Sequence, residues 1–119
     1  MSKTSDIMAL LDAGIRAESL RQKSIANNIA NIETPGYRRV EVKFEELLKK
    51  ALDSNGAVDL SEFKPLIFQP NETPVKSNGN DVSLEVEVGE MVKNTLRHKA
   101  YIRLLNRKFS QFDLAINVR

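Results

Sequence analysis

The fold is decided by residues 88–116, which read VGEMVKNTLRHKAYIRLLNRKFSQFDLAI. Apolar residues recur along this stretch at alternating spacings of three and four positions. A period of 3.5 residues is typical of the seam of a coiled coil, in which each seam residue packs against a partner helix. The series, in which only Thr95 and His98 are polar, consists of Val88, Met91, Thr95, His98, Ile102, Leu105, Phe109, Phe112 and Ile116. We therefore predict a long helix over residues 83–118.

The beginning of this helix carries the weakest signal. Apolar and polar residues alternate over residues 82–88, which is the period of a strand, and Gly89 costs a helix about 1 kcal/mol relative to Ala. We favour a helix from about Ser83. Asn80 or Asp81 is the expected cap, because a short side-chain oxygen can accept a hydrogen bond from the first free N–H groups.

A second helix is predicted over residues 6–32, a stretch without proline. Its apolar heptad positions are Met8, Leu11, Ile15, Ile25, Ile29 and Ile32, and the polar pair Glu18 and Gln22 lies between them. Pro35 disfavours helical geometry in the residue before it, and Gly36 permits a positive φ. The helix is therefore expected to end at the turn that these two residues form.

All four prolines lie in the middle segment, residues 33–80, and interrupt regular structure repeatedly. This segment is expected to be irregular and partly extended. Within it we predict one short helix over residues 44–52, a possible strand over residues 66–68 and a turn over residues 77–80, where Asn and Gly tolerate left-handed geometry.

The predicted fold is a single domain of 119 residues, dominated by α-structure, in which the two terminal helices pair as an antiparallel coiled coil. Such a hairpin buries little apolar area, and the longer C-terminal helix extends past its partner, so part of the seam is left for assembly. The seam residues expected to face one another, in the same or a neighbouring chain, are Leu11, Ile15, Ile25, Ile29, Met91, Ile102, Leu105, Phe109, Phe112 and Ile116.

Composition argues against catalysis. The chain contains no Cys and a single histidine, His98, so neither a thiolate site nor a pair of histidine ligands can form. No glycine-rich phosphate loop is present, and the carboxylates are expected on solvated faces, so no cofactor is predicted. No apolar run reaches the roughly 20 residues of a membrane span, and the first residues do not resemble a secretory signal peptide.

Charge is sorted along the C-terminal helix, with acidic residues in its first turns and six basic residues between Lys93 and Lys108. Two interpretations stay open: complementarity to the helix dipole, or contact between the acidic and basic ends of staggered neighbours. The basic residues also permit an alternative function as a helical nucleic-acid-binding module. A third class, export chaperones and regulatory coiled coils, would also contain two such helices, but it would not share the turn over residues 34–37.

Residues 26–37 read ANNIANIETPGY, and this stretch resembles the N-terminal signature of bacterial flagellar axial proteins, the rod, hook and hook-junction subunits. At a helix end, Asn amides can bond carbonyls that have no partner within the helix, and Pro followed by Gly fixes the exit of the chain. Tyr37 would then point outward, toward a neighbouring subunit. The expected assembly motif is Asn28, Asn31, Thr34, Pro35, Gly36 and Tyr37.

Both flanks of the chain are similar to the proximal rod branch of this family, notably Arg21-Gln22 and residues 80–85. The resemblance implies a structural protein that assembles helically at the proximal end of the flagellar drive shaft, with no small-molecule substrate and no nucleic acid. It also implies contacts with other rod proteins, with an adaptor of the FliE type, and with the membrane ring and export gate at the rod base. The implied location is the periplasmic rod, reached through the flagellar type III system without a cleaved signal.

Overall fold

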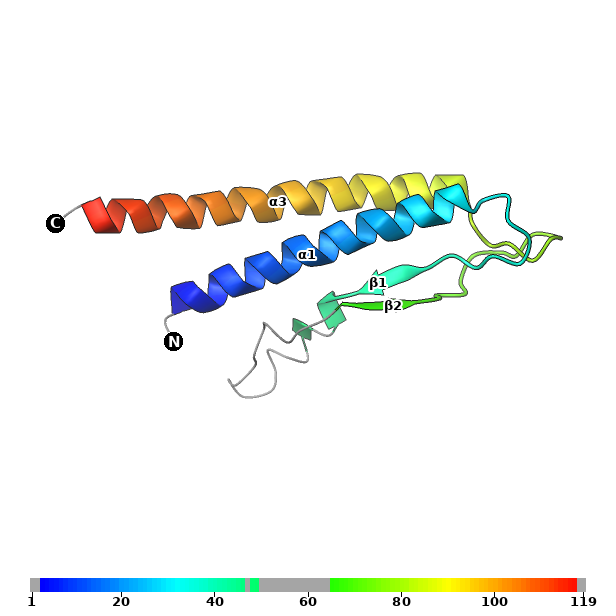
Figure 1. Ribbon diagram of the computed structural model, residues 1–119, viewed down its shortest axis with the longest axis horizontal. Helices are drawn as coiled ribbons and strands as arrows, with labels where there is room; N and C mark the ends of the chain where they lie inside the picture. Colours follow the sequence, from blue (N-terminus) through cyan, green and yellow to red (C-terminus); the bar gives the residue numbers. More distant parts are fainter. Residues whose placement is uncertain (1–2, 47, 50–64, 118–119) are drawn as a thin grey trace.

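The computed structural model describes residues 3–46, 48–49 and 65–117. Two long helices, α1 (Lys3–Ala30) and α3 (Leu84–Asn117), run antiparallel beside each other along a molecule with extents of 67 × 28 × 16 Å (Figure 1). A small sheet of β1 (Glu41–Lys43) and β2 (Leu66–Phe68) lies along α1. The predicted fold class, two terminal helices with a partly extended middle, is confirmed.

Both helices lie within a few residues of their predicted ranges. The alternative of a strand over residues 82–88 is wrong, because the helix is formed from Leu84 onward and the Glu87 N–H donates to the Ser83 carbonyl at 3.0 Å. Gly89 is tolerated inside this helix, where a methyl group in its place would meet nothing within 4 Å. The predicted cap is also wrong, since Asn80 and Asp81 bond other groups, described below.

The middle segment contains one predicted and one unpredicted strand. The apolar run of β2 forms a strand, as expected, and it pairs antiparallel with β1 so that Val42 lies opposite Ile67. Residues 45, 46, 48 and 49 are helical, whereas the rest of the predicted 44–52 helix lies outside the described residues. The turn over residues 77–80 is present, with Gly79 at a φ of 85°.

The apolar core is small and lies on the sheet side of α1. Ala13 and Ala17 are buried against Phe44, and Leu48 packs on the cluster from outside. Most other buried positions near the helix pair are polar, and the buried residues of α3 are Glu87 and Asn94. The contact between the two helices therefore combines buried polar side chains with buried and half-buried apolar ones such as Ile25 and Met91.

The row of α3 residues that faces α1 differs from the predicted seam. Buried and half-buried side chains of α3 follow a heptad spacing through Glu87, Met91, Asn94, His98, Tyr101 and Leu105. The neighbouring row is exposed along the whole helix; we call it the outer stripe, and it consists of Val88, Thr95, Ile102, Phe109 and Ile116. Met91, His98 and Leu105 belong to the predicted seam and are half-buried beside α1, whereas the residues of the outer stripe are exposed.

Gly14 is required by the close approach of Tyr101 to α1. A Cβ at Gly14 would lie 2.6 Å from Cε1 and 2.7 Å from Cζ of the Tyr101 ring, far inside contact distance. Gly14→Ala should therefore destabilise the fold by about 1–3 kcal/mol through overpacking, although Ala normally stabilises a helix interior by roughly 1 kcal/mol relative to Gly. Chemical denaturation measured by circular dichroism tests the effect.

The same substitution in a Tyr101→Ala background provides the control. Without the ring, Gly14→Ala should stabilise the protein by about 1 kcal/mol, so the sign of its effect reverses. An equal effect in both backgrounds would show that the Tyr101 ring does not restrict this position.

Candidate assembly site: the clasp at the end of the helix pair

The Asn28 side chain joins the end of α1 to the chain segment that follows it. Its Nδ2 donates to the Val40 carbonyl and its Oδ1 accepts from the Val40 N–H, both at 2.9 Å. The amide thus pairs with Val40 in the way that a neighbouring strand would, and it is fully buried. This double hydrogen bond folds the segment after α1 back along the helix and leads it into β1.

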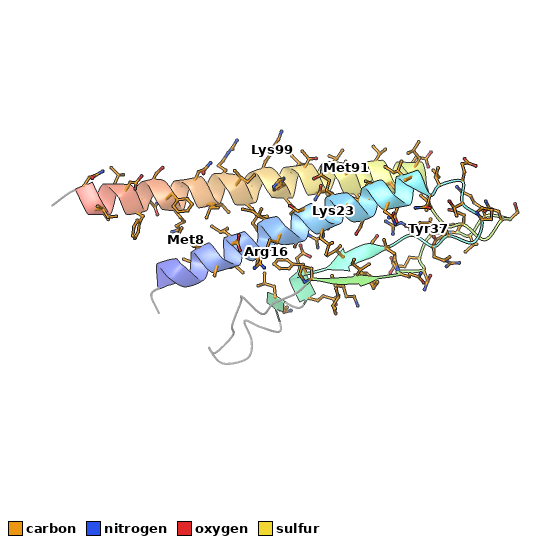
Figure 2. The ribbon with its side chains drawn as sticks, viewed as in Figure 1. Met8, Arg16, Lys23, Tyr37, Met91 and Lys99 are labelled. Atoms are coloured by element: carbon orange, nitrogen blue, oxygen red, sulfur yellow. The ribbon has the colours of Figure 1, made fainter. Side chains whose placement is uncertain are left out.

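Tyr37 closes the same contact from the outside of the turn. Its hydroxyl donates to Asn28 Oδ1 at 2.9 Å and accepts from Asn27 Nδ2 at 2.8 Å. Burial of the phenol, with Glu87 and Asp81 nearby, raises the pKa of Tyr37. The expectation that Tyr37 points outward is wrong, because its polar end is turned onto α1, near the end of the molecule where α1 ends (Figure 2).

Asn31, Thr34 and Gly36 shape the turn itself. Asn31 Nδ2 donates to the Asn27 carbonyl at 2.8 Å, and Thr34 Oγ1 donates to Asn31 Oδ1 at 3.1 Å. Gly36 has a φ of 75°, which confirms the predicted left-handed geometry, and its N–H donates to the Asn78 carbonyl at 2.9 Å. Pro35 lies exposed between them. The turn after α1 is therefore bonded to the turn that precedes α3.

The second turn also bonds the first turn through a side chain. Asn80 Nδ2 donates to the carbonyls of Asn31 and Thr34, at 2.9 and 2.8 Å, in the turns that follow α1. Gly79 permits this approach, because a Cβ there would lie 3.3 Å from the Gly36 Cα. Asn80, predicted to cap the beginning of α3, thus binds the turns that follow α1.

Buried charges complete the contact. Arg39 Nε donates to Glu87 Oε1 at 2.6 Å, and Asn28 Nδ2 reaches the other oxygen of the same carboxylate at 3.1 Å. Asp81 Oδ1 accepts from the Arg39 N–H at 2.6 Å, and Arg38 forms an ion pair with Asp81 at 3.3 Å. We call this network the clasp; its members are Asn28, Tyr37, Arg38, Arg39, Asn80, Asp81 and Glu87.

The clasp changes the interpretation of the sorted charges. Asp81 and Glu87 are almost fully buried and paired with arginines of their own chain. They are therefore not available to the basic stretch of a neighbour. Of the four acidic residues near the beginning of α3, Glu85 is exposed and Glu90 is partly exposed.

A second polar contact fixes the register at mid-helix. Glu18, buried on α1, accepts from Arg21 and from Arg97 of α3, both at 2.6 Å, and its backbone carbonyl accepts from Asn94 Nδ2 at 2.7 Å. Arg21 also binds Glu45; burial of Glu45 opposes ionisation, but the Arg21 bonds outweigh it and lower the pKa of Glu45. Because these groups are directional, a shift of one helix along the other would break several bonds together.

The structure places the predicted seam residues in three environments. Leu11 and Ile25 are buried, and Ile15, Ile29, Met91 and Leu105 are half-buried between or beside the helices. The remaining four are exposed on α3, with 41–53% of their surface accessible: Ile102, Phe109, Phe112 and Ile116. Their predicted burial against a neighbouring chain remains a prediction.

Other chemistries find little support in the described part of the chain. No three side chains of His, Asp or Glu within it are grouped so that they could hold a metal ion. Neither α1 nor α3 is both long enough and apolar enough to cross a membrane. Two of the six basic residues on α3 form ion pairs with acids of the same chain, Arg97 with Glu18 and Lys93 with Glu90.

Comparison with known proteins decides the family. The model of the family described as flagella basal body rod protein matches residues 14–38, which run from Gly14 through the turn to Arg38. The chain is 31% identical to the flagellar basal body rod protein FlgB of Bacillus subtilis over 125 residues, covering 98% of this chain and 97% of that protein. The chain belongs to the FlgB family of flagellar basal body rod proteins. FlgB proteins of Cereibacter sphaeroides (30% identical, 87% of this chain and 91% of theirs covered) and Borreliella burgdorferi (28%, 82% and 86%) are also similar.

Sequence reasoning on this FlgB-family chain found one half of the clasp and missed the other. The motif residues Asn28 to Tyr37 were recognised, but their partners Arg39 and Glu87 were not. A signal is present only for the separate mid-helix contact: Glu18 occupies a heptad position between apolar residues, where a polar side chain is expected to have a buried partner. No comparable signal marks Glu87, which looks like an ordinary acidic residue in a first helical turn.

The Tyr37 hydroxyl should contribute to the stability of the isolated subunit. Tyr37→Phe removes one hydrogen bond to Asn27 and one to Asn28, so the free energy of unfolding should fall by about 1–2 kcal/mol. Tyr101→Phe is the matched control, because the Tyr101 hydroxyl has no hydrogen bond to any residue that the structure describes. Equal stabilities of the two variants would contradict a local role for Tyr37.

Proposed function

We propose that this chain is a structural subunit of the bacterial flagellar basal-body rod, which assembles helically at the proximal end of the drive shaft and passes torque toward the hook. The observation that carries the proposal is the outer stripe, together with membership of the FlgB family. A row along a helix in which four of five side chains are apolar, and which is about half exposed at Val88, Phe109 and Ile116, is unusual for a protein that works as a monomer.

The shape of the subunit suits this role. The molecule is more than twice as long as it is wide, and its helices run along its length (Figure 1). The directional polar contacts of the clasp and of Glu18 hold the two helices in one register. A subunit whose internal register is fixed can transmit torque without its helices sliding past each other.

The proteins expected to contact this subunit follow from its proposed place in the rod. Other rod proteins continue the shaft, and an adaptor of the FliE type, the membrane ring and the export gate lie at its base. The subunit reaches the periplasmic rod through the flagellar type III system. A small apolar core suits a protein that is unfolded for passage through a narrow channel, and the buried hydrophobic residues of the described chain are few: Leu11, Ala13, Ala17, Ile25, Val42, Phe44 and Val82.

A deletion and a localisation test this function. In the organism that encodes the chain, deletion of the gene should abolish the hook and filament and stop swimming, and a plasmid copy should restore both. An epitope-tagged chain should be found in purified basal bodies by immunoblotting. Swimming cells with complete basal bodies after the deletion would contradict the proposal.

A further inference from the structure

The last turns of α3 carry an apolar face that is open to solvent. Every residue from 109 to 117 is exposed, and Figure 1 shows this end of the helix, in red, reaching past the beginning of α1. Three large apolar side chains recur there at spacings of three and four, which places them on one face of the helix. We call this face the tail patch; its members are Phe109, Phe112 and Ile116, each about half exposed. An exposed apolar face of this kind marks an interaction site.

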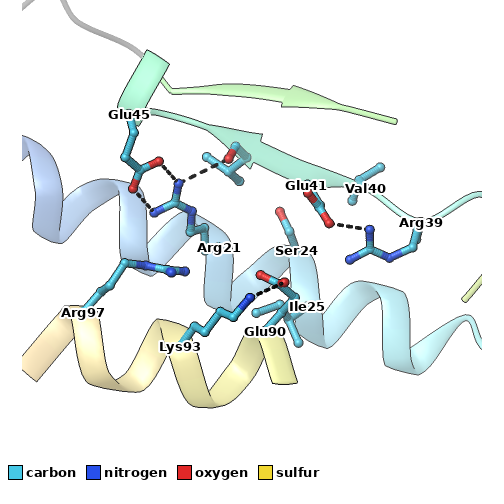
Figure 3. A pocket seen from close by; sticks show the side chains of 11 residues that line it. Arg21, Ser24, Ile25, Arg39, Val40, Glu41, Glu45, Glu90, Lys93 and Arg97 are labelled. Atoms are coloured by element: carbon cyan, nitrogen blue, oxygen red, sulfur yellow. Dashed lines mark hydrogen bonds and ion pairs between the residues drawn. The ribbon is translucent and has the colours of Figure 1, made fainter. Parts of the chain in front are cut away.

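A second apolar face lies at the beginning of the same helix. Its members follow a spacing of four residues, so they form one oblique ridge along α3. We call it the head patch; it consists of Leu84, Val88, Val92 and Leu96, with 52–63% of each residue accessible. The side of α3 that carries Glu90, Lys93 and Arg97 lines a cleft beside β1, and none of the head-patch residues lines that cleft (Figure 3). The head patch is therefore open for a different contact.

A single copy cannot join its own two patches. Their centres lie about 22 residues apart, which is roughly 33 Å at a rise of 1.5 Å per residue. Both patches belong to one helix that runs without a break from Leu84 to Asn117, so this separation is fixed. Covering both patches therefore takes other molecules, and two further copies of the chain, each supplying the opposite patch, are sufficient.

The charges beside the two patches differ in sign. Exposed basic residues precede the tail patch and form no ion pair with any residue whose side chain the structure describes; they are Lys99, Arg103 and Arg107. Asp113 is the acidic residue of this stretch. The exposed carboxylates at the head end of the molecule are Glu33, Glu72 and Glu85, beside the exposed Lys76. Lys93, also near the head patch, pairs with Glu90 at 3.6 Å (Figure 3). A tail patch on a head patch therefore brings basic residues toward acidic ones, whereas two tails or two heads would bring like charges together.

We propose that the tail patch of one copy of this chain docks on the head patch of the next copy in the rod. The inference rests on the proposed function, and it specifies which ends of α3 meet. A contact between two different faces leaves one free head and one free tail after every addition, so it continues as a helical assembly, whereas a face that pairs with itself stops at a dimer. Exclusion of water from the apolar side chains drives the contact, and the flanking charges select its direction.

Sedimentation of the purified full-length chain at increasing concentration tests the pairing of the two patches. The wild type should form an open series of oligomers, while Val92→Glu (head) and Phe112→Glu (tail) should each stay monomeric with a wild-type urea midpoint, since both side chains are exposed. An equimolar mixture of the two variants should stop at dimers, because one intact tail and one intact head remain. Leu104→Glu, outside both patches, should associate like the wild type. Dimers of either variant alone, or a wild type or mixture that stays monomeric, would overturn the proposal.

Thiol cross-linking of purified basal bodies tests the same contact in the rod. The chain contains no Cys, so Thr95→Cys with Asp113→Cys, at exposed polar positions beside the head and tail patches, introduces its only thiols. A short bis-maleimide should link position 95 of one copy to position 113 of another, and neither substitution alone should give a product. Lys93→Cys with Asp113→Cys is the control, because position 93 lines the cleft about 160° around α3 from position 95 (Figure 3). A chain present in basal bodies without the 95–113 link, or with equal yields from both pairs, would overturn the head-to-tail contact while the rod function stands. Absence of the wild-type chain from basal bodies would instead contradict the proposed function.

Discussion

Replacing Glu87 with alanine is expected to destabilise the subunit by about 3–5 kcal/mol, the cost of removing one partner from a buried ion pair. The Glu87 carboxylate is fully buried and receives hydrogen bonds from Arg39 Nε and Asn28 Nδ2. Without it, a buried guanidinium group and a buried amide each lose a partner. Because small domains are stable by only about 5–15 kcal/mol, the unfolding midpoint in urea should fall steeply.

Glu85→Ala is the matched control for this prediction. Glu85 lies in the same first turn of α3 but is exposed, so its replacement should change the free energy of unfolding by less than about 0.5 kcal/mol. The double variant Glu87→Leu with Arg39→Met should be more stable than Glu87→Ala, because no charge is left buried alone. A loss below about 1 kcal/mol for Glu87→Ala would show that the clasp does not depend on this carboxylate.

Sequence patterns predicted those parts of the fold that depend on local information. The period of apolar residues predicted both helices, α1 and α3. The end of α1 and the approximate beginning of α3 were also predictable, because Pro35-Gly36 and the Asn-Gly turn at residues 77–80 act on the chain locally. The strand β2 was found for the same reason, as an apolar run between two prolines. Its partner β1 was missed, since Val42 is its single apolar residue.

The clasp was only partly predictable, because its bonds join residues far apart in the chain. Asn28 and Glu87 are separated by 59 positions, and in the mid-helix contact Glu18 and Arg97 are separated by 79. Which of them meet depends on the register of the two helices, and that register is set by the contacts themselves. No local pattern indicates that Glu87 is buried while Glu85, two positions earlier, is exposed.

The predicted seam of α3 differs by one row from the side chains that face α1, for a related reason. The α3 helix carries two adjacent heptad rows, one through Met91 and Leu105 and one through Ile102 and Phe109. The row that faces α1 also contains Glu87 and Asn94, which the sequence suggests should be solvent-exposed. Apolar periodicity identifies a helix that needs a partner, but it does not distinguish the partner within the chain from one in the next subunit.

The result is a subunit that buries polar side chains beside the apolar ones between its helices and leaves other apolar side chains of α3 exposed on its surface. Directional polar contacts suit the interior, because they select one register and tolerate no sliding. Apolar contacts suit the surface, because they favour association with any complementary stripe and gain their free energy only when water is excluded. We therefore propose that folding and assembly depend on different rows of the same helix, and single substitutions should separate them.

Phe109→Ala should accordingly stop rod assembly while leaving the isolated subunit as stable as the wild type. Phe109 belongs to the outer stripe and is 50% exposed, so its replacement removes little from the fold of one chain. Between subunits, a buried aromatic side chain typically contributes about 2 kcal/mol or more, which weakens each contact roughly thirtyfold when it is lost. Since the loss recurs at every contact in the rod, cells carrying Phe109→Ala should export the subunit but fail to build rods or swim.

Leu104→Ala is the matched control for this last substitution. Leu104 is apolar and 47% exposed, but it lies about 140° around α3 from Phe109, away from the outer stripe. Swimming assays and immunoblots of basal bodies should show wild-type rods in the Leu104→Ala strain and none in the Phe109→Ala strain, with equal urea midpoints for both purified proteins. Normal swimming with Phe109→Ala would mean that the outer stripe is not the surface on which subunits meet. Reduced stability of the purified variant would mean instead that Phe109 supports the fold of the single chain.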